Sequence, residues 1–120
     1  MVCVLVRFAL PAEADRRSTL QAFHSAVPRF QGLPGLARKF FLMDVDHGQA
    51  GSVYLWADRR QAVSFHDEAW RAHIATKYGA PPTIDIFDCP FEIDNLLDRV
   101  VEHRGELEAG QPAEPADPAS

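Results

Sequence analysis

Three side chains that could take part in binding or catalysis lie at helical spacing in the middle of the chain, namely His66, Trp70 and His73. Their spacing places all three on one face of a helix. An imidazole titrates near neutral pH and can act as a general base or proton relay, and an indole offers a flat stacking surface. The alternative is an amphipathic helix whose aromatic stripe belongs to the core and whose histidines form hydrogen bonds at its margin. The first interpretation makes His66 and His73 the candidate catalytic residues.

The pattern argues against a metal site or a bound cofactor. Two helical turns separate His66 from His73, about 10 Å, which is too far for both to chelate one ion from this helix. The chain has two cysteines, Cys3 and Cys89, which are too few for a disulfide scaffold or a Cys-rich zinc site. We expect both to be buried and to act as small hydrophobic side chains. The sequence also lacks a Gly-rich phosphate loop, a Ser nucleophile elbow and a paired Cys motif. We therefore expect no metal and no cofactor.

Four further residues are candidates for substrate binding. Tyr54 and Trp56 share one face of an expected strand, where they form either a stacking surface with a phenol donor or part of an interface. Arg7 interrupts an otherwise apolar strand. A guanidinium buried there would pair with Asp85 or bind a substrate enolate or carboxylate. Phe40 completes the predicted substrate-binding set.

Hydrophobic periodicity predicts the elements that position these residues. Period-two alternation predicts strands over residues 2–10, 36–44, 52–57 and 83–89, and the helical period predicts helices over 13–26 and from about 58 to 78, the second with a break near Asp67. Pro28 is expected to end the first helix at Val27. The order βαββαβ is the ferredoxin-like arrangement of an α+β fold with an antiparallel sheet.

Within these elements, the pattern also predicts which side chains share a face. Leu20, Phe23, Val27 and Phe30 form the expected apolar stripe of the first helix. In the second strand Leu36, Phe40 and Leu42 are expected on one face, and Arg38 and Lys39 on opposite faces, so that at most one of these two cations points inward. We expect a short helix containing Leu96, Leu97, Val100 and Val101 after the last strand.

Residues 1–104 are expected to form one domain with this C-terminal arm, and residues 105–120 an acidic tail rich in Pro, Ala and Glu that is too poor in large apolar residues to fold. Most of the net charge of −5 lies in that tail. The remaining body has no basic footprint for nucleic acid, no apolar run near the roughly 20 residues of a membrane helix, and no signal peptide at its start. We therefore expect a cytoplasmic protein that binds neither nucleic acid nor membranes.

The expected strands carry apolar residues on both faces, whereas helices would cover one face only. A second copy that packs sheet against sheet, with the 91–101 arm crossing over, would cover the other face. The sequence thus predicts a homodimer.

Several short motifs carry a resemblance to a known family: Pro34-Gly35-Leu36, Lys39-Phe40-Phe41, Gly51 through Trp56, Ala62 through Phe65, and Phe87 through Pro90. Over roughly residues 2–95 the chain resembles the YdhR-type monooxygenases of the dimeric α+β-barrel superfamily, whose relatives include the antibiotic-biosynthesis monooxygenases. It departs from their pattern at Gly51-Ser52, where the family has Gly-Gly. The resemblance implies a cleft between sheet and helices in each protomer, lined by apolar and aromatic groups.

Members of that superfamily oxidise electron-rich aromatics without a cofactor, degrade haem, cyclise polyketides, isomerise lactones, or have no known activity. The leading expectation is a cofactor-independent monooxygenase that uses O2 on an aromatic or polyketide-like small molecule. The residues in play are His66 or His73 as base, Trp56 and Trp70 as platform, and Arg7 or Tyr54 as the donor to an anion. The alternatives are a polyketide cyclase or isomerase using the same base, a haem-binding relative, and a non-catalytic ligand-binding dimer.

Overall fold

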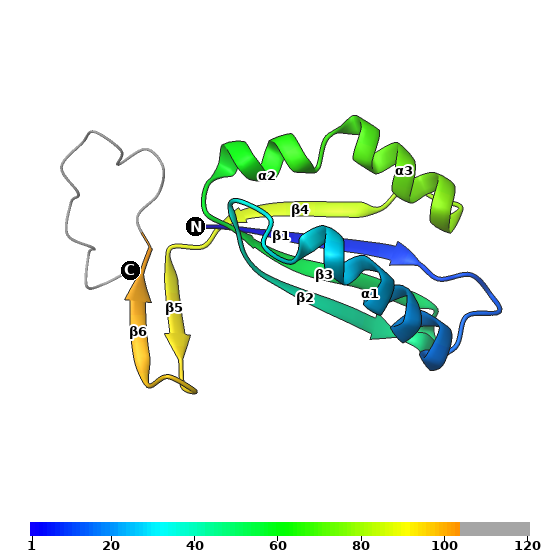
Figure 1. The fold of residues 1–120 in the computed structure, drawn as a ribbon, viewed down its shortest axis with the longest axis horizontal. Helices are drawn as coiled ribbons and strands as arrows, with labels where there is room; N and C mark the ends of the chain where they lie inside the picture. Colours follow the sequence, from blue (N-terminus) through cyan, green and yellow to red (C-terminus); the bar gives the residue numbers. More distant parts are fainter. Residues whose placement is uncertain (104–120) are drawn as a thin grey trace.

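The computed structural model describes residues 1–103, so the expected acidic tail lies outside the described residues. The strands are β1 (Val2–Ala9), β2 (Leu36–Asp44), β3 (Gln49–Trp56), β4 (Thr83–Asp88), β5 (Phe91–Asp94) and β6 (Arg99–Glu102); the helices are α1 (Arg16–Phe30), the 3-10 turn η1 (Val45–His47), α2 (Arg59–Phe65) and α3 (Glu68–Tyr78). Up to β4 this is the predicted βαββαβ order, with the second helical region divided near Asp67 as expected (Figure 1).

Four strands form an antiparallel sheet in the order β2-β3-β1-β4. Val4 of β1 lies opposite Tyr54 of β3 on one side and Ile86 of β4 on the other, so these three side chains share a face. The α+β class and the ferredoxin-like fold are therefore confirmed.

The core lies between this face and the helices. Its buried members are Val2, Val4, Val6, Phe30, Tyr54, Trp56 and Ala62. Val4 and Trp56 are the largest fully buried side chains among the described residues. Both cysteines are free thiols and only half-buried, which departs from the expectation that they belong to the core.

Helix α1 begins at a capping box, in which the Asp15 carboxylate accepts a hydrogen bond from the Ser18 backbone N–H at 2.7 Å. The predicted stop before Pro28 is wrong, because α1 continues to Phe30 with the proline inside it. Proline removes a helical hydrogen bond, but here it lies on the exposed side, where water can solvate the freed carbonyl.

The predicted apolar stripe of α1 is only partly correct. Leu20 and Val27 are 43% and 40% exposed. Thr19 and Phe30 are the buried positions of the helix, with Phe23 half-buried between them. The face of α1 that points toward the sheet therefore does not include Leu20 and Val27, which the periodicity placed on it.

Strand β2 contains a register shift between Leu36 and Arg38. A bulge of one residue reverses the alternation of side chains along a strand. As a result Leu36 shares the helix-covered face with Lys39, and Phe40 lies on the opposite face, so the predicted grouping of Leu36 with Phe40 is wrong.

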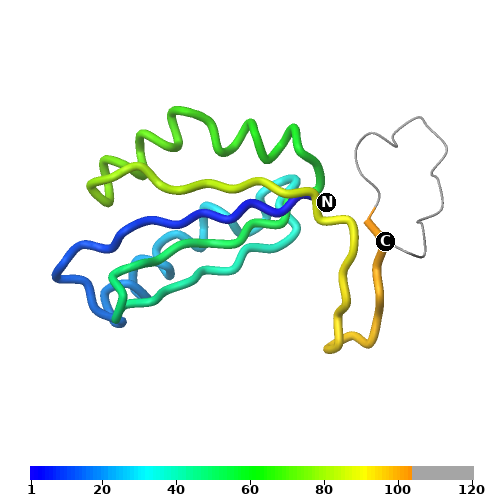
Figure 2. Tube along the Cα trace, turned by 180° about the vertical axis from the view of Figure 1, so that it is seen from behind, coloured from blue at the N-terminus to red at the C-terminus, as the bar shows by residue number. Residues whose placement is uncertain are grey.

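The predicted C-terminal helix is also wrong, since β5 and β6 pair as an antiparallel hairpin. The Asp94 carboxylate accepts hydrogen bonds from the backbone N–H groups of Leu96 and Leu97 at 3.0 and 3.1 Å, which fixes the turn. β-branched Val100 and Ile93 face each other in the ladder, where such residues are favoured over a helix. The hairpin projects past the end of the four-stranded sheet in both views (Figures 1 and 2).

Within the part of the chain that the structure describes, no helix is long and apolar enough to cross a membrane.

Candidate functional site

The break between α2 and α3 determines where the two candidate histidines lie. His66 is the C-cap of α2, and Asp67 caps α3 by accepting a hydrogen bond from the Trp70 backbone N–H at 2.9 Å. The turn directs His66 inward, where only 2% of the residue is exposed. His73 is exposed on α3 and lines none of the cavities described below. The structure therefore does not bring the two imidazoles together.

The His66 ring is held in a defined tautomer. Nε1 of Trp56 donates a hydrogen bond to Nε2 of His66 at 3.2 Å. Because an indole N–H can only donate, Nε2 is unprotonated and the neutral ring carries its hydrogen on Nδ1. Burial, with the nearby charges of Lys39 and Arg71, lowers the pKa of His66 to about 4. This imidazole is neutral at physiological pH, and its basic nitrogen, Nε2, already accepts the hydrogen bond from Trp56. His66 is therefore poorly suited to act as a general base.

Aromatic rings surround His66. Its ring centroid lies 4.5 Å from that of Tyr54 and 4.6 Å from that of Trp70, both edge to face. Tyr54 and Trp56 are nearly parallel, with centroids 6.1 Å apart. The structure thus gathers four of the predicted site residues into one buried cluster, to which Phe65 also belongs.

Next to this cluster, Lys39 of β2 extends into the space between sheet and helices. Its Nζ lies 3.3 Å from the ring centroid of Phe30, 4.2 Å from that of Phe41 and 4.5 Å from that of Tyr54. Ring faces attract a cation at these distances. In the described part of the chain, no carboxylate forms an ion pair with this amine.

The protonation of Lys39 is balanced near neutrality. Burial, and secondarily the charges of Arg29 and Lys77, lower the pKa of Lys39 to about 7. The ring faces oppose this shift because they favour the charged form. Lys39 can therefore both donate and accept a proton close to physiological pH.

A cavity of about 60 Å³ surrounds this amine. Its lining is largely apolar and aromatic and comes from α1, α3 and the covered face of the sheet: Val6, Phe8, Ala22, Phe23, Ala26, Phe30, Phe41, Tyr54, Trp70, Ile74 and Tyr78, together with Ser52. Three cations complete it, Arg29, Lys39 and Lys77, and no acidic residue in the described range lines it. We call this space the lysine cavity.

The two predicted platform residues face different spaces. Trp70 lines the lysine cavity, whereas Trp56 lines a separate outer groove between α2 and the loop containing Leu33 and Pro34. Tyr54 lines the lysine cavity from β3, and burial raises the pKa of its phenol, so it remains protonated and able to donate. Trp70 and Tyr54 are thus the predicted residues that can contact a ligand in this cavity.

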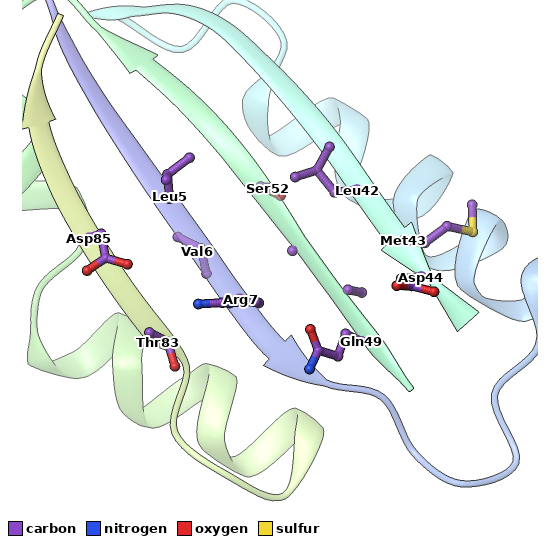
Figure 3. A pocket seen from close by; sticks show the side chains of 12 residues that line it. Leu5, Val6, Arg7, Leu42, Met43, Asp44, Gln49, Ser52, Thr83 and Asp85 are labelled. Atoms are coloured by element: carbon purple, nitrogen blue, oxygen red, sulfur yellow. The ribbon is translucent and has the colours of Figure 1, made fainter. Parts of the chain in front are cut away.

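Arg7 and Phe40 lie on the other face of the sheet, which no helix covers. Arg7 lines an open groove of about 360 Å³ there, and its side chain extends toward Thr83 and Asp85 of β4 (Figure 3). The expected ion pair between Arg7 and Asp85 is not found within the described residues. Arg7 is exposed in the single chain, on the face that the expected second copy would cover. Phe40 is 50% exposed, and the adjacent Phe41 is the residue that lines the lysine cavity.

Sequence reasoning missed Lys39, Arg29 and Lys77 as site residues. The only available signal was that Arg38 and Lys39 lie on opposite faces of one strand, so that at most one of them points inward. Arg29 and Lys77 lie one residue from Phe30 and Tyr78, at positions typical of solvated charges. Among residues 1–103 no cluster of three or more His, Cys, Asp or Glu residues is arranged to hold a metal ion.

Comparison with known proteins supports the fold. The sequence matches no protein-family model and no curated protein. The structure is similar to that of a protein of unknown function from Nitrosomonas europaea, with a TM-score of 0.56 and 20% identity over 73% of this chain and 87% of that one. It also matches a mutant of SnoaB, a cofactor-independent oxygenase from Streptomyces nogalater, with a TM-score of 0.48 and 21% identity over 73% of this chain and 91% of the other. The likeness to the Nitrosomonas europaea protein, at 20% identity, shows a shared α+β fold and leaves the reaction to be argued from the site.

Proposed function

We propose that the protein is a cofactor-independent monooxygenase that binds an anionic aromatic or polyketide-like small molecule in the lysine cavity. The observation that carries this proposal is a desolvated amine, Lys39, enclosed by aromatic rings, with further cations and no carboxylate among the described residues that line its cavity.

The charges of the cavity select the ligand. Arg29 and Lys77, at the ends of α1 and α3, attract an anion. The rings of Phe30, Phe41 and Trp70 offer flat apolar contact. A phenol or a β-dicarbonyl compound satisfies both demands, because its neutral form is apolar and its deprotonated form is an anion that three cations stabilise.

Lys39 replaces the predicted histidine as the proton acceptor. With a pKa lowered to about 7, a substantial part of the amine is neutral at physiological pH and can take the acidic proton of the substrate. The resulting ammonium then lies beside the phenolate or enolate. Oxidation of a substrate CH2 by O2 to C=O and H2O draws all its electrons from the substrate, so this reaction needs no external reductant.

Entry of such a substrate requires the cavity to open, since about 60 Å³ is smaller than an aromatic ligand. The wall that α3 provides is the least firmly packed. None of its eleven residues is buried, whereas α1 and α2 each contribute at least one residue to the buried set. We therefore expect α3 to move away from the sheet when the substrate binds.

The proposal includes the homodimer. The helix-free face exposes large apolar residues, among them Phe40 at 50% and Phe87 at 54%, and the β5–β6 hairpin exposes Ile93 at 68% and Leu96 at 96%. A lone two-stranded hairpin is marginally stable in water. The β5–β6 hairpin projects beyond the four-stranded sheet (Figure 2). A second copy can therefore cover the helix-free face of that sheet and the hairpin at once.

Light scattering tests this assembly against the chain mass of 13.4 kDa. We expect twice that mass, and Phe40→Asp should reduce it to the monomer. Val63→Asp is the matched control, because Val63 is 52% exposed on α2, away from the helix-free face. A wild-type monomer at micromolar concentration contradicts the homodimer.

An oxygen electrode tests the reaction, with anthrone, an enolisable aromatic ketone, as the probe. We expect protein-dependent oxygen consumption that Lys39→Met lowers by about 10²–10⁴-fold, as for loss of a general base. Arg17→Gln, an exposed cation of α1 outside the cavity, should leave the rate unchanged. Equal conversion without oxygen would favour the cyclase or isomerase alternative, and equal rates for Lys39→Met and wild type would refute the role of the lysine.

A further inference from the structure

We propose that Lys39 is also a nucleophile, which captures small anionic aldehydes and α-oxo acids as an imine inside the lysine cavity. This activity needs no oxygen and differs from the proton transfer proposed above. It shares the free amine of Lys39 with that proposal, but the two have separate readouts, because imine capture is measured without oxygen and oxygen consumption is measured without an aldehyde.

The Nζ atom of Lys39 adjoins open space inside the lysine cavity. The Nζ atom lies over the ring of Phe30 at 3.3 Å from its centroid and within 4.5 Å of the centroids of Phe41 and Tyr54. No ion pair of Nζ is found in the described range, so no carboxylate has to be displaced before it attacks a carbonyl. The adjoining space of about 60 Å³ suits a molecule of only a few heavy atoms better than an aromatic one.

Charged and titratable groups face this amine from each packed element. Arg29 comes from α1, Tyr54 from β3, and Lys77 and Tyr78 from α3, and the buried His66 lies behind Tyr54. The arginine and the second lysine destabilise the ammonium form of Lys39 and thereby increase the fraction of free amine. The same two cations attract a carboxylate, so an anionic carbonyl compound is favoured over a neutral one.

The chemistry is a condensation in which atoms balance. The neutral Nζ attacks the carbonyl carbon, and the carbonyl oxygen takes a proton to give a carbinolamine. Loss of water, with the second amine proton, then forms the C=N bond. The phenol of Tyr54 stays protonated because burial raises its pKa, and it is a donor for the oxygen that leaves.

The chain has only three primary amines, which are Lys39, Lys77 and the α-amino group, so modification of each can be followed separately. The folded protein is incubated with glyoxylate and sodium cyanoborohydride, which reduces an imine to a stable carboxymethyl amine. Peptide mass mapping then compares the extent of modification at Lys39 and Lys77 over time. Lys77 also lines the cavity but is exposed, so it serves as the comparison for the effect of burial, and the α-amino group is the second comparison.

At pH 7 we expect Lys39 to be modified at least about tenfold faster than Lys77, because a pKa near 7 leaves roughly half of the amine neutral, against under 1% for an ordinary lysine. The rate at Lys39 should level off just above neutrality. Acetaldehyde, a neutral aldehyde, should show a smaller preference for Lys39, and Arg29→Gln should reduce the preference for glyoxylate.

Equal rates at the two lysines, faster modification of Lys77, or modification of Lys39 only in denaturant would each overturn the inference. Lys39→Met should lose the rapid modification while the α-amino group still reacts at its wild-type rate. Far-UV circular dichroism of each variant shows that the fold is retained.

Discussion

Replacing Lys39 by methionine tests the electrostatics of the cavity through stability. A pKa lowered from its ordinary 10.5 to about 7 means that the folded state disfavours the ammonium. Taken at face value this is a cost of about 5 kcal/mol. Part of the side chain keeps contact with solvent and three ring faces attract the charge, so we expect a net cost of about 2 kcal/mol.

The pH dependence follows from proton binding. Between about pH 7 and 10.5 the unfolded state binds the Lys39 proton and the folded state does not, so the stability of the wild type rises with pH over this window. Below pH 7 both states are protonated and the full cost is present. Methionine has similar length and no charge, so Lys39→Met should be more stable than wild type at pH 6 by about 2 kcal/mol. This advantage should shrink as the pH approaches 10.

Urea unfolding at pH 6, 8 and 9.5 measures this difference. Arg17→Met is the control, since Arg17 is an exposed cation of α1 outside the lysine cavity and the same charge is removed, and we expect its difference from wild type to be small and to vary little over this range. The reasoning is refuted if Lys39→Met destabilises the protein by the same amount at every pH, because the amine would then contribute by packing and not by its charge.

Three further substitutions test the fold around the site. Trp56→Phe removes the donor to Nε2 of His66 and leaves a buried acceptor unpaired, so urea unfolding should show a loss of about 1–3 kcal/mol, and an unchanged midpoint would mean that the 3.2 Å hydrogen bond contributes nothing. Gly51→Ala should prevent folding or shift β1 from β3, because a Cβ there would lie 2.0 Å from the Val6 carbonyl oxygen; a normal melting curve would contradict this geometry. Asp94→Ala should loosen the β5–β6 turn, seen as faster amide exchange of Leu96 and Leu97 with little change in the main sheet, and unchanged exchange would show that the carboxylate does not hold the turn.

Period-two alternation was sufficient to predict β1, β2 and β4 to within a residue or two, because each strand is covered on at least one face and its pattern is strong. The arm was missed for a physical reason. The spacing that predicted a helix there, that of Leu96, Leu97, Val100 and Val101, arises by chance. Asp94 accepts two backbone hydrogen bonds in the turn and so favours a hairpin over a helix. The prediction that Pro28 ends the first helix gave the proline too much weight. One lost hydrogen bond at an exposed position costs less free energy than the packing of Phe30 contributes.

For the site, the sequence singled out His66, Trp70, Tyr54 and Trp56 as candidates, and the structure brings these four side chains together in one cluster. Their roles could not be predicted, because they depend on a helix break that turns one histidine inward and leaves the other in solvent. No periodicity encodes which ring nitrogen of His66 accepts the indole proton.

The position of the cavity amine depends on one irregularity in β2. Leu36, the first residue of β2, faces the helices, and the bulge between Leu36 and Arg38 moves the next inward position to Lys39. Without the bulge, Arg38 and Phe40 would face the helices, and Lys39 would face the uncovered side. A guanidinium in that place would stay charged at any physiological pH and could neither accept a proton from a substrate nor attack a carbonyl, whereas an amine can do both once it is desolvated. The chemistry proposed for the cavity therefore rests on the local backbone geometry at Ala37 as much as on the lysine itself.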